Sequence, residues 1–187
     1  MRSFKYSVLE NVEPVLTSDF TPLTLNTVGQ SVDIDLATHF MDEDGEPLEY
    51  RVNSLDANLL SAELVDGTTM RITARGFGLG QVRASVFDAM GASVRSDIPV
   101  LIRPAGEKVT VLEGSVFSDK LTILTAENPA STTVRLVSAS GTVAVEASGE
   151  FSAFNPVVLQ TGKLAPGIYT LSVDIAGDVT KMTLVKK

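Results

Sequence analysis

The stretch Lys163-Leu-Ala-Pro-Gly-Ile-Tyr-Thr-Leu-Ser-Val-Asp-Ile-Ala-Gly-Asp-Val-Thr-Lys-Met-Thr-Leu-Val-Lys-Lys187 decides the predicted fold. Pro166-Gly167 predicts a turn into a strand, and Gly177-Asp178 predicts the turn that reverses the chain into a second strand. Apolar side chains alternate with polar ones along both strands, at Tyr169, Leu171, Val173, Met182 and Leu184. A period of two is typical of half-buried strands, so this stretch predicts a β-hairpin with one face in a core.

The same period recurs along the rest of the chain. Alternating segments lie at 32–36, 48–52, 70–74 and 82–86, and again at 121–125, 134–137 and 143–145. Turn signals separate them, at Asp66-Gly67, Gly76-Phe-Gly-Leu-Gly80, Asp88-Ala-Met-Gly91 and Ser140-Gly141. Many short strands with regular turns are typical of β-sandwiches. We therefore predict an all-β fold of two consecutive Ig-like β-sandwich domains joined by a short Pro/Gly linker.

The predicted domain boundary lies near Arg103-Pro-Ala-Gly-Glu107, where proline and glycine interrupt the strand pattern. Residues 21–103 hold 12 acidic and 6 basic residues, and every basic one is arginine. Residues 104–187 hold 8 acidic and 7 basic residues, six of them lysine. The predicted organisation is an upstream tail at 1–20, an Ig-fold domain at 21–103, a linker at 104–107 and a second sandwich at 108–187.

Composition limits the partners. The chain is 44% hydrophobic and 20% charged, which is typical of a globular protein. Its net charge of −8 argues against nucleic acid, because phosphate binding needs clustered basic residues. The longest apolar runs, such as Ile98–Ile102, have strand length, and a membrane helix needs about 20 residues, so no membrane insertion is predicted. Cysteine is absent, which leaves no thiol nucleophile and no thiolate metal site.

The sequence predicts that this chain is not an enzyme. It has no metalloprotease helix, phosphate loop or nucleophile elbow. His39 is its only histidine, and a lone imidazole is usually a packed structural residue, so no role is assigned to it. A small hydrolase would require His39 to lie beside a serine and an aspartate.

Three segments resemble, in order, the type A C-terminal sorting domain of cargo proteins of the type IX secretion system. Val111–Ile123 resembles its first box, although Glu113-Gly114-Ser115 stands where Pro-Asn-Pro is common. Val134–Val143 is similar to its middle box, a strand, a small-residue turn and another strand. Leu164–Tyr169 and Lys181–Lys187 resemble the last box, which is the most specific.

This resemblance, which covers about residues 107–187, implies a secreted protein held on the extracellular side of the outer membrane. The sorting domain would be recognised by the outer-membrane translocon and removed by a sortase that joins the remainder to surface lipopolysaccharide. The implied sorting-motif residues are Leu164, Gly167, Tyr169, Gly177, Lys181, Lys186 and Lys187. The implied cleavage region is the linker, expected to be extended and exposed, at Arg103, Pro104, Ala105, Gly106 and Glu107.

Such cargo carries a signal peptide, and residues 1–20 have no apolar block of that kind. We therefore expect the chain to be the C-terminal part of a longer precursor.

The N-terminal half carries a second resemblance. Val28–Tyr50 and the later Val86–Gly91 are similar to the dystroglycan-type, cadherin-like Ig fold of bacterial surface proteins. The pattern is Gly-x-Ser, then Phe-x-Asp-x-Asp-Gly-x-x-Leu-x-Tyr, then Asp-x-x-Gly, and it covers about residues 12–102. This resemblance implies a spacer or adhesive module, often with bound calcium.

Asp42, Asp44 and Asp88 are the candidate calcium ligands, because hard cations select carboxylate oxygens. The loop is not an EF-hand, because Phe40 and Arg51 would fall on its first and twelfth positions. The alternative is that Asp-x-Asp-Gly is a turn whose carboxylates cap backbone N–H groups.

The favoured function is thus a surface-display segment, an Ig-like spacer followed by a cleavable secretion signal. The alternatives are a calcium-dependent adhesion module, a carbohydrate- or protein-binding module, or accessory domains of a larger secreted hydrolase. Sugar stacking usually needs exposed aromatic rings, and the chain has no tryptophan and only 3 tyrosines.

Overall fold

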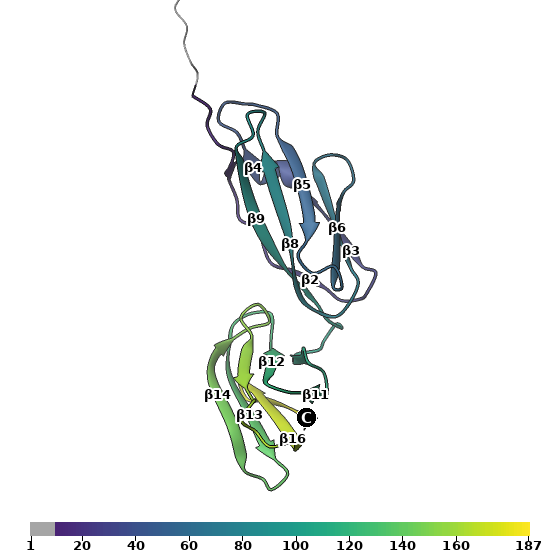
Figure 1. The fold of residues 1–187 in the computed structure, drawn as a ribbon, viewed down its shortest axis with the longest axis vertical. Coiled ribbons are helices and arrows are strands. Elements are labelled where there is room, and N and C mark those ends of the chain that lie inside the picture. The colour runs from purple at the N-terminus through teal and green to yellow at the C-terminus, as the bar shows by residue number, and fades with distance from the viewer. Residues whose placement is uncertain (1–9) are drawn as a thin grey trace, which may run out of the picture. The chain divides into compact units, whose positions relative to one another are not determined.

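The computed structural model describes residues 10–187 and divides the chain into two compact units (Figure 1). Unit 1 extends to Val100 apart from residues 77–79, and unit 2 comprises residues 77–79 and Leu101–Lys187. The division at Val100 falls three residues before the predicted one at Arg103. The predicted upstream tail at 1–20 lies partly outside the described residues. In the described part of the chain no helix is long and apolar enough to span a membrane.

Unit 1 is a sandwich of two sheets. The four-stranded sheet has the order β2 (Leu23–Leu25), β9 (Ser93–Ile102), β8 (Gly78–Phe87) and β5 (Glu49–Ser54). The three-stranded sheet has the order β3 (Ser31–Asp35), β7 (Thr69–Ala74) and β6 (Leu60–Leu64). A short ladder pairs β1 (Val15–Leu16) with β4 (Phe40–Met41), and the 3-10 turn η1 (Leu36–Thr38) precedes β4.

The predicted alternation forms the core of unit 1. Along β8, Val82, Ala84 and Val86 are fully buried, whereas the residues between them point outward. Met70 and Ile72 of β7 face the same interior from the other sheet. Burial of these apolar side chains is what holds the two sheets together.

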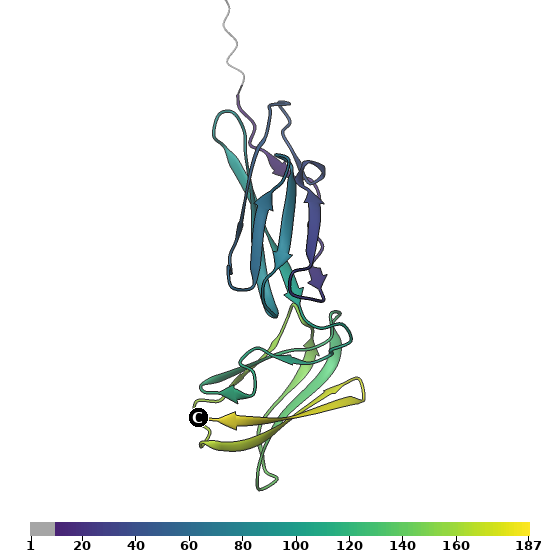
Figure 2. The ribbon, with the colours of Figure 1, turned by 90° about the vertical axis from the view of Figure 1, so that its right-hand side faces the viewer.

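Unit 2 is also a sandwich. Its three-stranded sheet has the order β10 (Thr110–Val111), β12 (Lys120–Leu124) and β15 (Val157–Gln160). Its five-stranded sheet has the order β11 (Val116–Phe117), β17 (Asp178–Lys186), β16 (Gly167–Ile175), β13 (Ala130–Ser138) and β14 (Val143–Phe151). The long hairpin of β16 and β17 is yellow in Figure 2.

The closing hairpin belongs entirely to unit 2. β16 pairs with β13 and β17, and β17 pairs on its other side with β11 in parallel. Tyr169, Leu171, Val173 and Leu184 are buried in one core with Leu121 and Ile123 of the opposite sheet. The predicted all-β fold of two Ig-like sandwiches is confirmed.

Some local predictions need correction. The turn of the closing hairpin is Ala176-Gly177 and not Gly177-Asp178, because Asp178 already pairs with Ile175. The glycine-rich stretch is only partly a turn, since Gly78 begins β8. Leu36, predicted in a strand, lies in η1, where the Asp35 side chain accepts a hydrogen bond from the Ala37 N–H and ends the strand.

Candidate functional site

Residues 164–169, where the sequence predicted the last sorting box, form a structural corner at the start of β16. The hydroxyl of Tyr169 donates to the carbonyl of Ala165 at 2.9 Å, four residues upstream. The Tyr169 ring is buried edge-on to Phe117, with ring centroids 6.1 Å apart. Leu164 packs against the same core, and Gly167 has a φ of +157°, which favours glycine. This arrangement resembles the tyrosine corner of Ig-like sandwiches.

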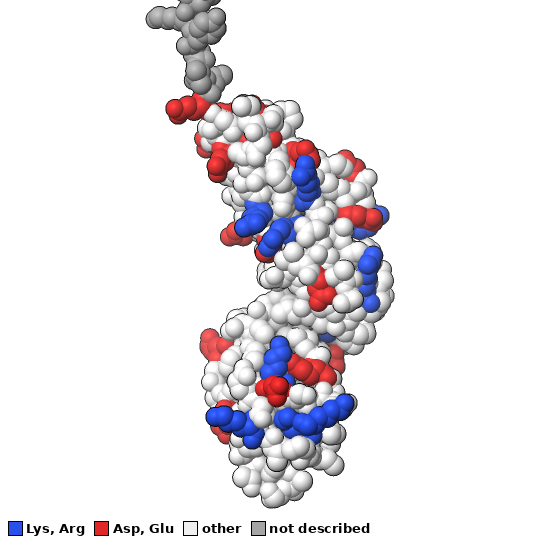
Figure 3. Space-filling model, viewed as in Figure 1, with Lys and Arg blue, Asp and Glu red and all other residues white. Residues whose placement is uncertain are grey.

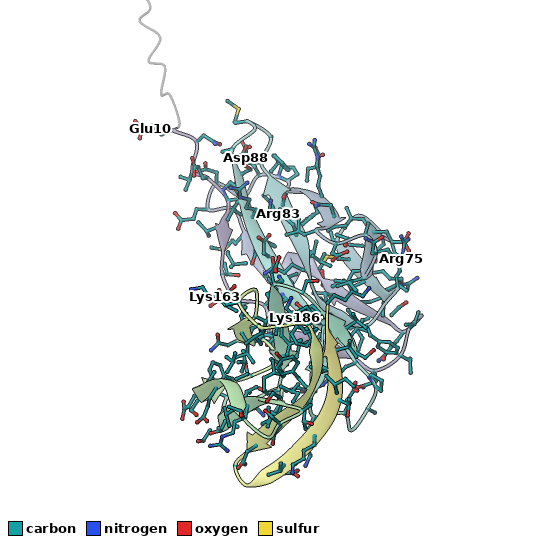
Figure 4. The ribbon with its side chains drawn as sticks, turned by 60° about the horizontal axis from the view of Figure 1, so that its bottom comes forward. Glu10, Arg75, Arg83, Asp88, Lys163 and Lys186 are labelled. Atoms are coloured by element: carbon teal, nitrogen blue, oxygen red, sulfur yellow. The ribbon has the colours of Figure 1, made fainter. Side chains whose placement is uncertain are left out.

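The other predicted motif residues lie at the surface, with one exception. Gly177, Lys181 and Lys187 are exposed, as is Gly167. Lys186 is only 7% exposed, and its Nζ donates to the carbonyl of Lys187 at 2.6 Å. Lys181 and Lys187 are therefore open to solvent, whereas Leu164, Tyr169 and Lys186 are partly or fully buried (Figure 4 labels Lys186).

The final residues are held by backbone hydrogen bonds to Ser115 and Phe117, which lie in the predicted first box. Val185 donates its N–H to the carbonyl of Ser115 at 2.8 Å, and Lys187 donates to that of Phe117 at 3.1 Å. The Glu113 carboxylate accepts hydrogen bonds from the N–H and the hydroxyl of Thr122, at 2.7 and 2.9 Å. Glu113 is thus a structural residue that sequence reasoning missed, because it lies in a turn and its partner is nine residues away on β12.

The predicted cleavage region has two parts. Arg103 is buried, and its guanidinium donates to the Thr125 carbonyl at 2.6 Å and lies 3.7 Å from a Glu127 carboxylate oxygen. Pro104, Ala105, Gly106 and Glu107 are exposed. The expected exposure is therefore wrong for Arg103, because a backbone carbonyl in unit 2 binds its side chain.

Two of the three candidate calcium ligands, Asp42 and Asp88, cap turns in their own loops. Asp88 Oδ1 accepts the N–H groups of Met90 and Ala92 at 2.9 and 2.8 Å, and its Oδ2 accepts the Asn11 amide at 2.8 Å. The Asn11 amide, followed by the turn N–H groups, holds the pKa of the Asp88 carboxyl below its usual value. Asp44 Oδ2 accepts the Val12 N–H at 2.7 Å. The bonds of Asp88 match the turn-forming alternative, whereas the bond of Asp44 joins its loop to a distant segment.

Two carboxylate oxygens in the same loop have no such partner. Asp42 Oδ1 accepts the Asp44 N–H at 2.8 Å, but its Oδ2 is buried without a hydrogen bond, and so is Glu46 Oε2. Asp44 and Glu46 also line a hollow of about 350 Å³ with Glu10, Asn11 and Met90. Within residues 10–187 no three acidic or histidine side chains converge as a metal site. The unpartnered oxygens are the one feature here that fits a cation.

His39 makes the packing and hydrogen-bond contacts of a structural residue. Its ring stacks on Phe20 with centroids 4.0 Å apart, and its Nδ1 lies 2.9 Å from the Ser18 hydroxyl. Asp19 follows that serine, but no hydrogen bond joins its side chain to His39 among the described residues. The ring therefore anchors the segment before β2 to the start of β4.

The fold defines an all-β protein of two Ig-like sandwich units. No protein-family model matches the sequence, and no curated protein matches it. Among solved structures, the D00-D0 domain of intimin is 14% identical, with a TM-score of 0.38 over 94% of this chain and 98% of that one. Endo-fucoidan hydrolase MfFcnA4 from glycoside hydrolase family 107 is 14% identical, with a TM-score of 0.38 over 94% of this chain and 28% of that one.

Dimeric latent PorU from Porphyromonas gingivalis is 13% identical, with a TM-score of 0.31 over 95% of this chain and 20% of that one. This chain thus spans 28% of the hydrolase chain and 20% of the PorU chain. At these values the likeness concerns the type of fold alone.

Proposed function

We propose that the chain is a non-catalytic surface-display segment. In this proposal unit 2 is a C-terminal sorting domain for the type IX translocon, and unit 1 is an Ig-like spacer on the cell surface. The observation that carries the proposal is the closing hairpin: Tyr169 fixes its start, Lys186 is buried at its end, and Lys181 and Lys187 remain exposed. A receptor would thus meet a rigid, lysine-bearing hairpin.

The test is export of a reporter fused ahead of residues 1–187 in a host that has this secretion system. We expect the reporter on the cell surface, and in the periplasm when the fusion stops at residue 106. Lys181→Ala and Lys187→Ala should reduce export without changing the melting temperature, because both side chains are exposed. Equal export of the truncated fusion would contradict the proposal.

A sortase would cut in the exposed part of the linker, between Pro104 and Lys108. Arg103 is a poor position for the scissile bond, because its side chain is buried and hydrogen-bonded to Thr125. Mass spectrometry of the displayed reporter should therefore find a C-terminus at or after Pro104. A terminus before Arg103 would place the cut elsewhere.

Calcium binding by unit 1 is a second proposal, which the unpartnered oxygens of Asp42 and Glu46 support. Those two carboxylates would hold the cation, and the remaining ligands would be carbonyl oxygens or water. Calorimetric titration with calcium should release heat with the unaltered chain and none with Asp42→Asn. Glu43→Gln is the matched control, because Glu43 is an exposed acid of the same loop. Absence of heat and of a melting shift at millimolar calcium would end this proposal.

A further inference from the structure

Three arginines of unit 1 lie on one outward face of its four-stranded sheet. Arg51 is on β5, Arg83 on β8 and Arg95 on β9, and each occupies the exposed phase of its strand. Arg51 lies opposite Ser85, and Arg83 lies opposite Asn53. Figure 3 shows basic side chains gathered over these strands. We name this surface the arginine face, made of Arg51, Arg83, Arg95, Asn53, Ser85 and Ser93.

The three guanidinium groups differ in what they contact. Arg83 forms a two-point ion pair with Asp97, at 2.6 and 2.8 Å, so its charge is neutralised. Arg51 lies over the Phe87 ring, 4.6 Å from the centroid, and only its Nε is bound, to Glu49 at 2.8 Å. Within residues 10–187 Arg95 makes no ion pair. Arg51 and Arg95 therefore keep N–H groups free for an external anion.

The spacing of these two arginines limits the ligand. β5 and β9 flank β8, so Arg51 and Arg95 lie about 10 Å apart across the sheet, with Ser85 between them. Glu49 and Asp97 sit on the same face. A polymer with a negative charge on every unit, such as nucleic acid, would bring some of its charges against these carboxylates. A polymer with alternate charged and neutral units would not.

We propose that the arginine face binds an acidic polysaccharide that carries a carboxylate or sulfate on alternate sugars. Each guanidinium would form a two-point hydrogen bond with one acidic group, and the Phe87 ring packs against the guanidinium of Arg51. The neutral sugar between them would hydrogen-bond through its hydroxyls to Ser85, Asn53 and Ser93. The charge of the whole chain does not prevent this, because salt screens charges beyond about 8 Å. The site lies in unit 1 and does not depend on the function proposed for unit 2.

The test uses the full chain in EDTA, which removes any calcium contribution, and hyaluronan oligosaccharides as the probe, since these carry a carboxylate on alternate sugars. Titration calorimetry should show binding that weakens as salt rises. We expect the double variant Arg51→Gln with Arg95→Gln to lose affinity by about tenfold or more. The matched control is Arg71→Gln with Arg75→Gln, which removes the same charge from other arginines of unit 1; Figure 4 labels Arg75 well apart from Arg83. The control should lose no more than about twofold.

Chondroitin sulfate, uncharged chitin oligosaccharides and polyglutamate separate the chemistries. Chondroitin sulfate carries an acidic group on every sugar, so weaker binding than that of hyaluronan would support the proposal, and equal or stronger binding would overturn it. Equal binding of polyglutamate, or of the uncharged oligosaccharide, would overturn it, as would an equal loss in both double variants. No binding of hyaluronan would also overturn it. Melting curves of all variants check that the fold is retained.

Discussion

β8 and β16 hold the same place in their sheets, since each lies between the next strand of the chain and an earlier one. Both begin at a glycine with a positive φ, +148° at Gly78 and +157° at Gly167. Two residues further on they differ. Gly80 of β8 faces Leu60 so closely that a Cβ would lie 2.9 Å from its Cδ1, whereas the corresponding residue of β16 is the buried Tyr169.

The difference shows two ways to fill one position of a sandwich. In unit 1 a side chain from β6 occupies the space and the strand needs a glycine. In unit 2 the strand supplies its own ring, and its hydroxyl closes the corner at Ala165. The strands that follow β5 and β13 also differ, in the sheet that each one joins. β6 joins the opposite sheet, whereas β14 remains beside β13. Four predictions test this comparison, in order of expected effect.

Tyr169→Ala should have the largest effect. It removes a buried ring and a hydrogen bond, so the free energy of unfolding of unit 2 should fall by about 3–5 kcal/mol. Chemical denaturation followed by circular dichroism measures this loss. Tyr169→Phe, which keeps the ring, should cost only about 1 kcal/mol. If both variants cost the same, the hydrogen bond and not the ring holds the corner.

Gly80→Ala should destabilise unit 1 by about 1–3 kcal/mol, because Leu60 is fully buried and cannot turn aside without strain. The same denaturation experiment applies. Ser85→Ala is the matched control on the outward face of the same strand, and we expect little change from it. An unchanged midpoint for Gly80→Ala would show that the glycine is not required by Leu60.

Ala176→Asn should stabilise unit 2 by about 0.5–1 kcal/mol. Ala176 has a φ of +51° beside Gly177 at +94°, and a two-residue hairpin turn with both φ values positive favours Asn-Gly. Thermal unfolding should show a higher melting temperature. Ala176→Val should lower it, because a branched side chain is strained at this φ. A lower melting temperature for the asparagine variant would count against this turn.

Acid should lower the stability of unit 1 before that of unit 2. Of the four predictions this one has the smallest effect per residue, because each carboxylate is near solvent. Arg71 lowers the pKa of Asp33, and Arg83 lowers that of Asp97. The Thr69 N–H lowers the pKa of Asp66. A lowered pKa means that the folded state resists protonation. Its contribution is therefore present above the usual aspartate pKa of about 4 and is lost as pH falls through the lower folded value.

Calorimetry between pH 5 and pH 2 should show the transition of unit 1 moving to lower temperature faster than that of unit 2. The Tyr169→Ala variant identifies which transition belongs to unit 2. Asp66→Asn should reduce the pH dependence of unit 1 alone. Parallel shifts of both transitions would contradict the prediction.

The sequence predicted most strands because their apolar period follows from the pleat itself. The alternation at 82–86 and at 169–173 reappears as buried and exposed faces of β8 and β16. Its errors lie where the chain turns. The sequence placed the hairpin turn at Gly177-Asp178, one residue too late, and placed Gly78 in a turn although it begins β8. Turn positions depend on strand pairing, which a local pattern does not contain.

For the candidate sites, too, the sequence identified residues whose contacts only the structure shows. The sequence singled out Asp42, Asp44 and Asp88, but only the structure shows that each of them accepts a backbone N–H, and that Glu46 has a buried oxygen without a partner. Arg103 looked like exposed linker, and its buried position depends on a carbonyl 22 residues away. Contacts of this kind join residues that no short motif links.

The sequence by itself determined the class of fold and the position of the closing hairpin, because side-chain period and turn residues act over a few neighbours. Tertiary structure alone decided which sheet each strand joins, why Gly80 and Tyr169 fill equivalent places, and that Arg51, Arg83 and Arg95 share a face. Those outcomes depend on pairing between distant strands, and the free energy of packing two sheets selects that pairing.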